Sequence, residues 1–294
     1  MPAPSFFKIP LGGDRFGAGD FDAIVISDGE IEFDTVASEF PSAPEVEVNK
    51  LIDPLSLARR PPVLQLNCLV LKLGSRIVLF DTGMGASTML GAGAGRLPRN
   101  LADAGINADQ IDAIVLTHLH CDHAWGLIDA CSAPTFPNAR VFLSGIEHSV
   151  WTGEDGSDAI PGEEALAMRN CLAPYRDRLS FVADGAAFID GVTAIATPGH
   201  TSGHMSYLIA TPGRDLFNIG DLCHHSAVQF ANPHWLFRWD DNPTQAVRSR
   251  LQAFSMAAER GVELVGFHLP FPGVGRVERE GDGFRFHPTG AGSS

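Results

Sequence analysis

The 294-residue sequence predicts an α+β protein in which two mixed sheets pack face to face and helices cover their outer faces. Three observations support this αββα sandwich. Apolar runs of strand length recur between residues 63 and 268, helical segments separate them, and strands in both halves of this region end in histidine or aspartate. No linker interrupts the region. We therefore expect a single domain over residues 1–294, with residues 1–60 as an N-terminal extension that packs on the core or on a dimer partner.

The composition is that of a compact protein. Hydrophobic residues make up 45% and charged residues 19%, with a mean hydropathy of +0.05, which argues against a disordered chain or a membrane protein. A formal charge of −14 disfavours nucleic acid and anionic membrane surfaces as partners. Five cysteines without a CxxC pair favour a reducing compartment. The amino terminus shows no basic region followed by an apolar run, so we expect a cytoplasmic location.

The first half of the chain predicts a series of strands that lead toward polar residues. A hairpin is expected near the start, with strands at 21–26 and 30–33 joined by a turn at Ser27-Asp28-Gly29. Further strands are expected at 63–71, 77–80, 112–117 and 140–143, and helices at 97–104 and 163–175. Residues 151–160 are expected to form a polar surface loop.

The second half repeats this plan. Strands are expected at 187–189, 193–196, 206–209, 216–219 and 262–267. Asn242 followed by Pro243 predicts the start of a helix whose apolar face includes Val247, Leu251 and Phe254. A closing hairpin is expected over 275–286.

The segment His118-Leu119-His120-Cys121-Asp122-His123 contains four side chains that bind divalent metals, and its short spacing predicts a tight loop. Further residues of these types end later strands. The candidate ligands are His118, His120, Asp122, His123, His200, Asp221 and His268. One tetrahedral ion cannot use seven ligands, whereas two ions that share the Asp221 carboxylate would use them all. Two such ions, roughly 3.5–4 Å apart, activate water for hydrolysis. No nucleophile elbow or phosphate-binding loop supports another chemistry.

The hexapeptide resembles the H-x-H-x-D-H signature of the metallo-β-lactamase superfamily, and His200, Asp221 and His268 follow in the order that this superfamily uses. The resemblance covers most of the chain. It implies the αββα sandwich and hydrolysis by a metal-bridging hydroxide. The stretches at 220–222, 227–230, 267–273 and 281–286 resemble the branch that contains methyl parathion hydrolase and related lactonases and arylesterases.

That similarity also divides the ligands. His118, His120 and His200 would hold one ion, Asp122, His123 and His268 would hold the other, and Asp221 would be shared. The expected cofactors are two divalent ions, with zinc first and manganese, iron or cobalt as alternatives. Asp221 and Asp122 are the candidate catalytic carboxylates, and Asp221 would take the proton as the hydroxide is consumed. Members of this branch are commonly homodimers, so we expect a homodimer.

Three activities are compatible with this site. The leading hypothesis is hydrolysis of a small-molecule lactone or aryl ester, with phosphotriesters as promiscuous substrates. A phosphotriesterase of the methyl parathion hydrolase type is the first alternative, although the polar pair His224 and His225 suits an ester carbonyl at least as well. The second alternative is a non-hydrolytic di-iron member with a flavin partner, but the sequence contains no flavodoxin-like domain.

Aromatic residues are dense around the ligand segments. Core packing is the default for each one, but together they predict an apolar pocket over the metals. The candidate pocket residues are Trp125, His224, Phe230, Trp235, Phe237, Trp239 and Phe271. His224 has equal claims as a pocket residue and as part of a solvated loop. Asp81 either orients a ligand histidine through its other ring nitrogen or is a plain turn carboxylate. His204 is expected to be a hydrogen-bonded structural histidine, and Cys121 to point away from the ligands.

Overall fold

The computed structural model describes residues 5–11, 21–52, 62–153, 160 and 162–289. These residues form two sheets of seven strands each. The first sheet has the order β1 to β7, and the second has the order β14-β13-β12-β11-β10-β9-β8. Each sheet contains parallel and antiparallel neighbours, so both are mixed, and the predicted fold class is confirmed.

The first sheet comes from the N-terminal part of the chain. Its strands are β1 (Phe6–Lys8), β2 (Phe21–Glu32), β3 (Val63–Leu73), β4 (Arg76–Phe80), β5 (Ala113–Val115), β6 (Arg140–Ser144) and β7 (Leu179–Val182). The pairs β4–β5, β5–β6 and β6–β7 are parallel. Their carboxyl ends therefore meet at one edge of the sheet, where the segment from Thr117 to His123 begins.

The second sheet comes from the C-terminal part. Its strands are β8 (Ala187–Ile189), β9 (Val192–Ala196), β10 (Met205–Ile209), β11 (Leu216–Gly220), β12 (Glu263–Gly266), β13 (Val274–Glu280) and β14 (Gly283–Pro288). The pair β11–β12 is parallel, so Asp221 and His268, which follow these two strands closely, leave the sheet on the same side. The closing hairpin β13–β14 agrees with the sequence prediction.

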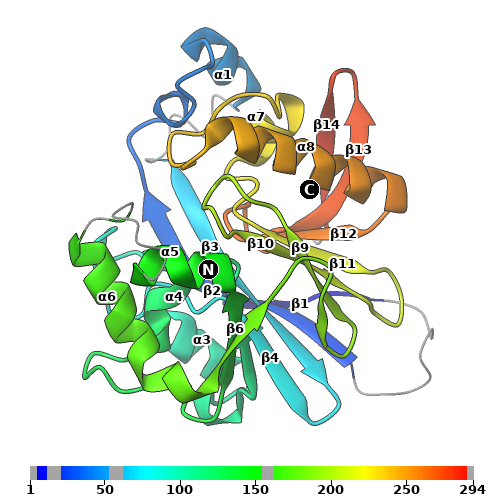
Figure 1. The fold of residues 1–294 in the computed structure, drawn as a ribbon. Helices are drawn as coiled ribbons and strands as arrows, with labels where there is room; N and C mark the ends of the chain where they lie inside the picture. Colours follow the sequence, from blue (N-terminus) through cyan, green and yellow to red (C-terminus); the bar gives the residue numbers. More distant parts are fainter. Residues whose placement is uncertain (1–4, 12–20, 53–61, 154–159, 161, 290–294) are drawn as a thin grey trace.

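The helices form the two outer layers (Figure 1). The helices α3 (Leu97–Asp103), α4 (Cys121–Ala124), α5 (Gly145–Thr152) and α6 (Gly162–Leu172) lie on the first sheet, whereas α7 (Ser226–Ala231) and α8 (Pro243–Arg260) lie on the second. A short helix near the N-terminus, α1 (Glu45–Leu51), lies beside α7. No helix of the described residues has the length and apolar character that a membrane span requires.

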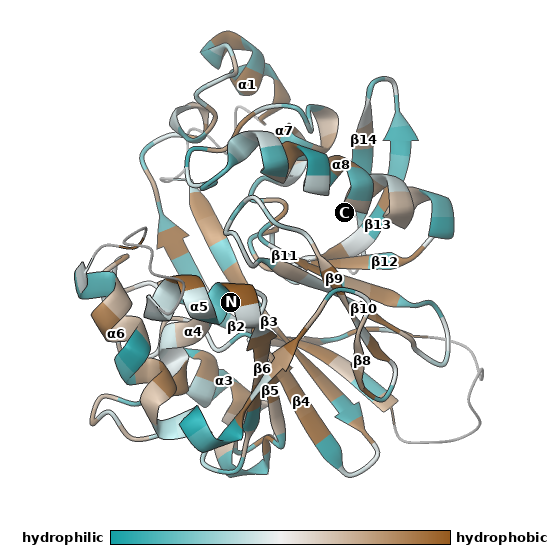
Figure 2. Cartoon of the chain, in the orientation of Figure 1, coloured by the Kyte–Doolittle hydropathy of each residue, from teal (hydrophilic) through white to brown (hydrophobic). Residues whose placement is uncertain are grey.

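Strand β3 shows why the sheets pack in four layers. Its residues alternate: Cys68 and Val70 face the helices of the outer layer, whereas Leu69 and Leu71 face the second sheet. Between the sheets, the Phe80 ring packs edge-on against Tyr207, with centroids 5.5 Å apart. Each fully buried large apolar side chain contributes about 1.5–3 kcal/mol. In Figure 2 the strands in the middle of the molecule are mainly brown, whereas teal residues are common on the helices and on the hairpin β13–β14.

Helix α8 covers the second sheet and begins where the sequence predicts. The Asn242 side chain accepts a hydrogen bond from the Gln245 backbone at 3.1 Å, and Pro243 is the first helical residue. The helix packs Phe254 and Ala257 against the sheet. Arg250 lies on the same buried face and is fully inaccessible. This buried cation becomes important for the site described below.

One prediction from the first half is wrong, and a second is contradicted only at its first residues. Residues 21–33 do not form a hairpin, because β2 runs unbroken from Phe21 to Glu32 and pairs with β3 along its whole length. Ser27-Asp28-Gly29 is a bulge in that pairing, stabilised by the Asp28 carboxylate, which accepts hydrogen bonds from the backbone of Met84, Gly95 and Leu97.

The predicted loop over 151–160 also differs. Trp151 is a buried residue of α5, where its indole N–H donates to Glu147, and residues 154–159 lie outside the described part of the chain.

Candidate metal centre

The hexapeptide after β5 divides into two conformations. Residues up to His120 are extended loop, and α4 then begins at Cys121. The backbone N–H groups of His123 and Ala124 donate to the His120 carbonyl, which closes one helical turn. The prediction of a tight loop over the whole segment is therefore corrected. Asp122 and His123, in this turn, fall in a different ligand group from His118 and His120.

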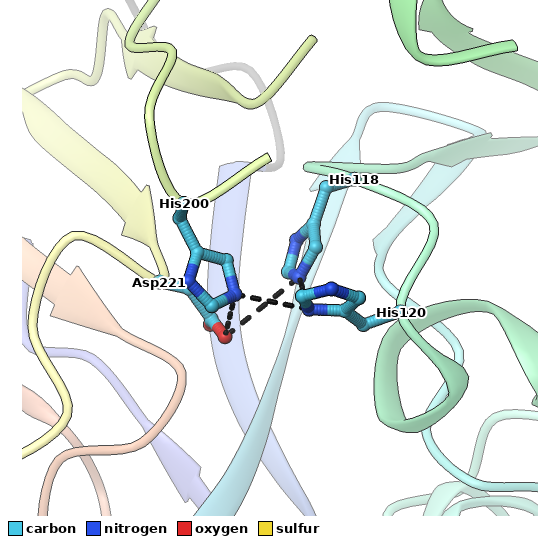
Figure 3. A group of neighbouring side chains, drawn as sticks. All are labelled: His118, His120, His200 and Asp221. Atoms are coloured by element: carbon cyan, nitrogen blue, oxygen red, sulfur yellow. Dashed lines mark hydrogen bonds and ion pairs between the residues drawn. The ribbon is translucent and has the colours of Figure 1, made fainter. Parts of the chain in front are cut away.

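His118, His120, His200 and Asp221 form the first ligand group (Figure 3). The Nδ1 atom of His120 lies 3.0 Å from the Nε2 atom of His118 and 3.0 Å from the Nε2 atom of His200. The Oδ2 atom of Asp221 lies 3.2 Å from His200 Nε2. Two of these histidines follow β5 of the first sheet, whereas His200 and Asp221 come from the second sheet, so the group bridges the two layers.

Asp122, His123 and His268 form the second group beside the first. The Nε2 atom of His268 lies 3.4 Å from Asp122 Oδ2 and 3.0 Å from Asp221 Oδ2. The Nε2 atom of His123 lies 3.1 Å from the other carboxylate oxygen of Asp221. Asp221 thus reaches both groups. Of the seven ligands, six are buried and only His120 is partly exposed, so solvent approaches the centre from the His120 side.

The donor atoms fit divalent metal ions. Three imidazole nitrogens converge at 3.0 Å separations, near the edge of about 3.3 Å expected around a tetrahedral ion with Zn–N bonds of about 2.0 Å. His123 Nε2 and Asp221 Oδ1 are buried and face each other at 3.1 Å, yet neither has a hydrogen-bond partner among the described residues. Buried polar atoms rarely lack partners. Nitrogen and carboxylate donors of this kind suit zinc, manganese, iron and cobalt.

Several ionisable side chains of the site have pKa values far from their ordinary values. Burial would raise the pKa of Asp221, but the charges of His123 and His268 hold it well below its ordinary value. Burial opposes charge on His200, but hydrogen bonds to Asp221 and Asp240 raise its pKa to about 10. Burial and neighbouring imidazoles lower the pKa of His118 and His120. The cluster is therefore a compact set of coupled groups of the kind found at functional centres.

The loop that carries His200 lies between the first turns of two helices. A Cβ atom on Gly199, whose φ is +132°, would lie 2.1 Å from the Ala246 nitrogen in α8. A Cβ atom on Gly203 would lie 2.3 Å from the Glu147 nitrogen in α5. The N–H groups of Asp241 and Asn242 donate to the carbonyls of His200 and Gly199. Close backbone contact on both sides therefore fixes His200, and only glycine permits that approach.

Three of the ligand histidines, His123, His200 and His268, have a partner at the ring nitrogen that faces away from the metal centre. His123 Nδ1 lies 3.1 Å from Asp81, so Asp81 is placed where it can orient a ligand histidine. His200 Nδ1 lies 3.0 Å from Asp240 Oδ1. His268 Nδ1 lies 3.0 Å from the Gln65 carbonyl. These contacts determine which nitrogen each ring presents to the centre.

Asp240, Arg250 and Glu147 were not identified from the sequence. Asp240 lies in the aromatic segment that precedes a helix, where the sequence pattern indicates only a connecting loop. Glu147 follows Ser144 at the spacing of a capping box, which indicates a role in capping the helix. Arg250 offered a signal, because it shares the buried stripe of α8 with Ala246, Ala253 and Ala257. A cation in an apolar stripe predicts a buried anionic partner.

The predicted pocket residues occupy different environments. The Phe237 ring stacks on His224 with centroids 3.7 Å apart, and Trp235 packs against the same apolar cluster as Phe237. His224 Nε2 lies 3.3 Å from Asp221 Oδ2, so His224 is part of the centre. Trp125 is half-buried directly after α4. These residues lie beside the ligands or on the segments that carry them.

The other three aromatics, Phe230, Trp239 and Phe271, make contacts with other parts of the molecule. Phe230 is buried in the core of the second sheet, between the rings of Phe254 and Phe286. Trp239 is 59% exposed, and its indole N–H donates to Glu39. Phe271 packs against the core between the sheets. A role of these three residues in a substrate pocket stays a prediction.

His204 and Cys121 occupy the positions that the sequence suggested. His204 is buried, its Nε2 atom accepts a hydrogen bond from the Asp221 backbone, and its Nδ1 atom pairs with Thr197. It therefore supports the ligand Asp221 through the backbone. Cys121 packs against the apolar core of the first sheet.

A family model described as the Metallo-beta-lactamase superfamily matches residues 61–265. The structure aligns with that of AidC, a dizinc quorum-quenching lactonase in complex with a product, at a TM-score of 0.84 and 28% identity, covering 97% of both chains. It also aligns with the hydrolase AbOPH at a TM-score of 0.84 and 30% identity, covering 95% of this chain and 98% of that one. An N-acyl homoserine lactonase of Bacillus thuringiensis is 25% identical over 181 residues, which are 56% of this chain and 64% of the relative. The matches span less than two thirds of the curated relatives' lengths.

Proposed function

Because the chain belongs to the metallo-beta-lactamase superfamily, we propose that it is a dinuclear metal-dependent hydrolase that opens lactones. The observation that carries this proposal is the convergence of two ligand groups on the two oxygens of Asp221. Two divalent ions, with zinc the first candidate, would supply Lewis acidity and water of lowered pKa. His118, His120 and His200 would hold one ion, Asp122, His123 and His268 the other, and Asp221 would contact both.

Asp221 is the proposed proton acceptor. Its neighbours keep the carboxylate anionic, since its pKa lies well below the ordinary value despite complete burial. Asp122 is the second candidate, because its Oδ2 atom faces His268 at 3.4 Å and its side chain keeps slight exposure. Either carboxylate can hold a proton released during ester hydrolysis.

His224 is the proposed substrate-facing group. Burial lowers its pKa to about 3, so the ring is neutral at physiological pH. Its Nε2 atom pairs with Asp221 Oδ2, while its buried Nδ1 atom has no hydrogen-bond partner in the part of the chain that the structure describes. Phe237 holds the ring by stacking. A neutral ring with an unused polar atom beside an apolar side chain suits an acyl substrate with a polar carbonyl.

Lactones are proposed ahead of other substrates because of two relatives. AidC is a lactonase that resembles this chain over nearly its full length, and the Bacillus thuringiensis relative acts on N-acyl homoserine lactones. Aryl esters are proposed as further substrates, since the same attack on an ester carbonyl cleaves both. Homodimer formation and a cytoplasmic location stay predictions of the sequence.

The test combines metal analysis with a substrate panel. The purified protein is expected to contain about two divalent ions and to hydrolyse N-acyl homoserine lactones, with loss of activity on chelation and recovery on metal addition. Activity that survives complete chelation would contradict the proposal. A kcat/KM for phosphotriesters above that for every lactone and aryl ester would favour the phosphotriesterase alternative. A coloured, iron-loaded protein without hydrolytic activity would favour the redox alternative.

A further inference from the structure

Glu147 is a buried carboxylate outside the ligand set, and its four hydrogen bonds connect both loops of the first ligand group. Its side chain is 1% exposed. The Oε1 atom accepts from the Leu119 backbone at 3.0 Å and from the Trp151 indole at 2.9 Å. The Oε2 atom accepts from the Thr201 hydroxyl at 2.7 Å and from the Gly203 backbone at 2.9 Å. All four donors are neutral, so the carboxylate has no cationic partner among them.

Two of these donors adjoin metal ligands. Leu119 lies between His118 and His120, and Thr201 follows His200 directly. Glu147 therefore joins the backbone of the loop after β5 to the backbone of the loop before β10, which come from different sheets. Among the described residues, no hydrogen bond joins Glu147 to Asp122, His123 or His268. The contact is specific to one ligand group.

The position of Glu147 is itself fixed. It is the third residue of α5, and its backbone N–H donates to the Ser144 side chain, which caps the helix. In a capping box the glutamate side chain would turn back to the cap residue. Here it turns inward, and the absence of a side chain at Gly203 lets the His200 loop touch the Glu147 backbone. A buried carboxylate that leaves its helix cap in this way has another structural task.

We propose that Glu147 is a positioning residue for the metal ion held by His118, His120 and His200, and that it sets the affinity of that ion without affecting the other. This inference rests on the proposed function, since it requires a dinuclear centre. The carboxylate holds the three imidazoles at their mutual distances by linking the two loops that carry them. Partners that orient metal ligands typically change metal affinity 10- to 100-fold when they are removed.

The test is a zinc titration of chelator-depleted protein against a chromophoric competitor. In Glu147→Gln the amide nitrogen would face a backbone N–H group and could not accept its hydrogen bond. The affinity for one of the two zinc equivalents should therefore fall about 10-fold or more, while the affinity for the other stays unchanged. Thr201→Val, which removes one hydroxyl donor, should weaken the same equivalent to a smaller extent and serves if Glu147→Gln does not fold. Trp151→Phe is the matched control. It removes one donor to Glu147 that belongs to α5 itself but keeps an aromatic ring beside His120, whose ring centroid lies 5.9 Å from that of Trp151, so both equivalents should stay unchanged.

Double variants identify the affected ion. Glu147→Gln should add nothing to His118→Ala, in which the first ion is already lost, but should weaken the remaining equivalent in His268→Ala. Thermal unfolding of the metal-depleted variants provides a readout of a purely structural role. Equal weakening of both equivalents, or lowered thermal stability with unchanged zinc affinity, would overturn the inference. A wild-type protein that binds two equivalents while Glu147→Gln binds them equally well would overturn this inference alone. A wild-type protein that binds no metal would overturn the proposed function as well.

Discussion

His123 and His200 are held by buried carboxylates in two different ways. Asp81 faces His123, and within the described part of the chain its other hydrogen bonds come only from the Thr117 backbone and hydroxyl. Asp240 faces His200 and also contacts the Arg250 guanidinium at 3.4 Å. Burial raises the pKa of Asp81 despite its neighbours, whereas His200 and Arg250 overcome burial and lower the pKa of Asp240. The same task is thus performed by Asp240, which has the permanent cation Arg250 beside it, and by Asp81, which has no lysine or arginine partner among the residues that the structure describes.

The difference affects what each substitution leaves behind. Arg250 donates to the carbonyls of Leu222, Pro233 and Trp235 as well as to Asp240, so it connects the His200 partner to the segment that carries His224 and Phe237. Removing Asp240 leaves Arg250 without its carboxylate, whereas removing Asp81 leaves neutral Thr117 donors and His123, whose charge is still balanced by Asp221 and Asp122. A buried unpaired charge costs far more than a lost neutral hydrogen bond.

The largest expected effect is at Asp221, where both halves of the comparison meet. Asp221→Asn should lower kcat for lactone hydrolysis about 1,000-fold or more, because the amide cannot serve both ligand groups or accept a proton as the carboxylate does. Steady-state kinetics and circular dichroism check this. Near-wild-type kcat in a folded, metal-loaded variant would show that the shared position of Asp221 is unimportant.

The next effect separates the two carboxylates by stability. Asp240→Asn should destabilise the metal-depleted protein by about 3–5 kcal/mol, because Arg250 loses its buried counter-charge. Asp81→Asn should cost about 1–3 kcal/mol, since His123 keeps the Asp221 carboxylate 3.1 Å from its Nε2 atom and Asn tolerates the positive φ of +58° found at Asp81. Urea denaturation measures both. Equal losses would show that the cation makes no difference.

Asp28 extends the comparison to a buried carboxylate whose hydrogen bonds come from the backbone. Burial raises its pKa from 3.8 to about 6, a change equivalent to about 3 kcal/mol. The folded protein therefore binds this proton more tightly than the unfolded chain. The stabilisation is fully present below pH 3.8 and is lost as the pH rises through about 6.

Asp28→Asn cannot titrate, so its stability relative to the wild type should fall by up to about 3 kcal/mol as the pH is lowered from 7 to 4. Urea unfolding at several pH values within this range measures the difference, and groups that titrate in both proteins cancel. Parallel pH profiles would mean that Asp28 does not carry the raised pKa.

The smallest effect concerns metal affinity. Asp81→Asn should weaken the ion bound by His123, and Asp240→Asn the ion bound by His200, each about 10- to 100-fold. Competition titrations with zinc resolve the two equivalents. If both substitutions weakened the same equivalent, the assignment of each carboxylate to a different half of the centre would fail.

The candidate ligands could be predicted from the sequence because each one follows a strand or lies in a short motif. Asp81 could be predicted for the same reason, since it directly follows β4. The helix α8 was predicted from Asn242-Pro243, a local signal that the structure confirms. Local sequence patterns and the ends of strands therefore predict most of the fold and the candidate ligand set.

What the sequence left open depends on contacts between distant segments. Phe230 and Phe237 look alike in the sequence, but one packs in the core and the other stacks on His224. Ser27-Asp28-Gly29 has the composition of a hairpin turn, yet it forms a bulge because three backbone N–H groups about 60 residues away bond to Asp28. Glu147 and Asp240 likewise acquire their roles only when α5 and the loop before α8 meet the His200 loop.

Each ligand group takes residues from both sheets, as His118 with His200 and His123 with His268 illustrate. Bound ions would therefore cross-link the two sheets of the sandwich at the edge where the strands end. A ligand that binds only the folded state stabilises it by an amount that grows with the logarithm of its free concentration. The free energy of unfolding of this protein would then fall as the free metal concentration falls, so metal depletion would lower its stability as well as its activity.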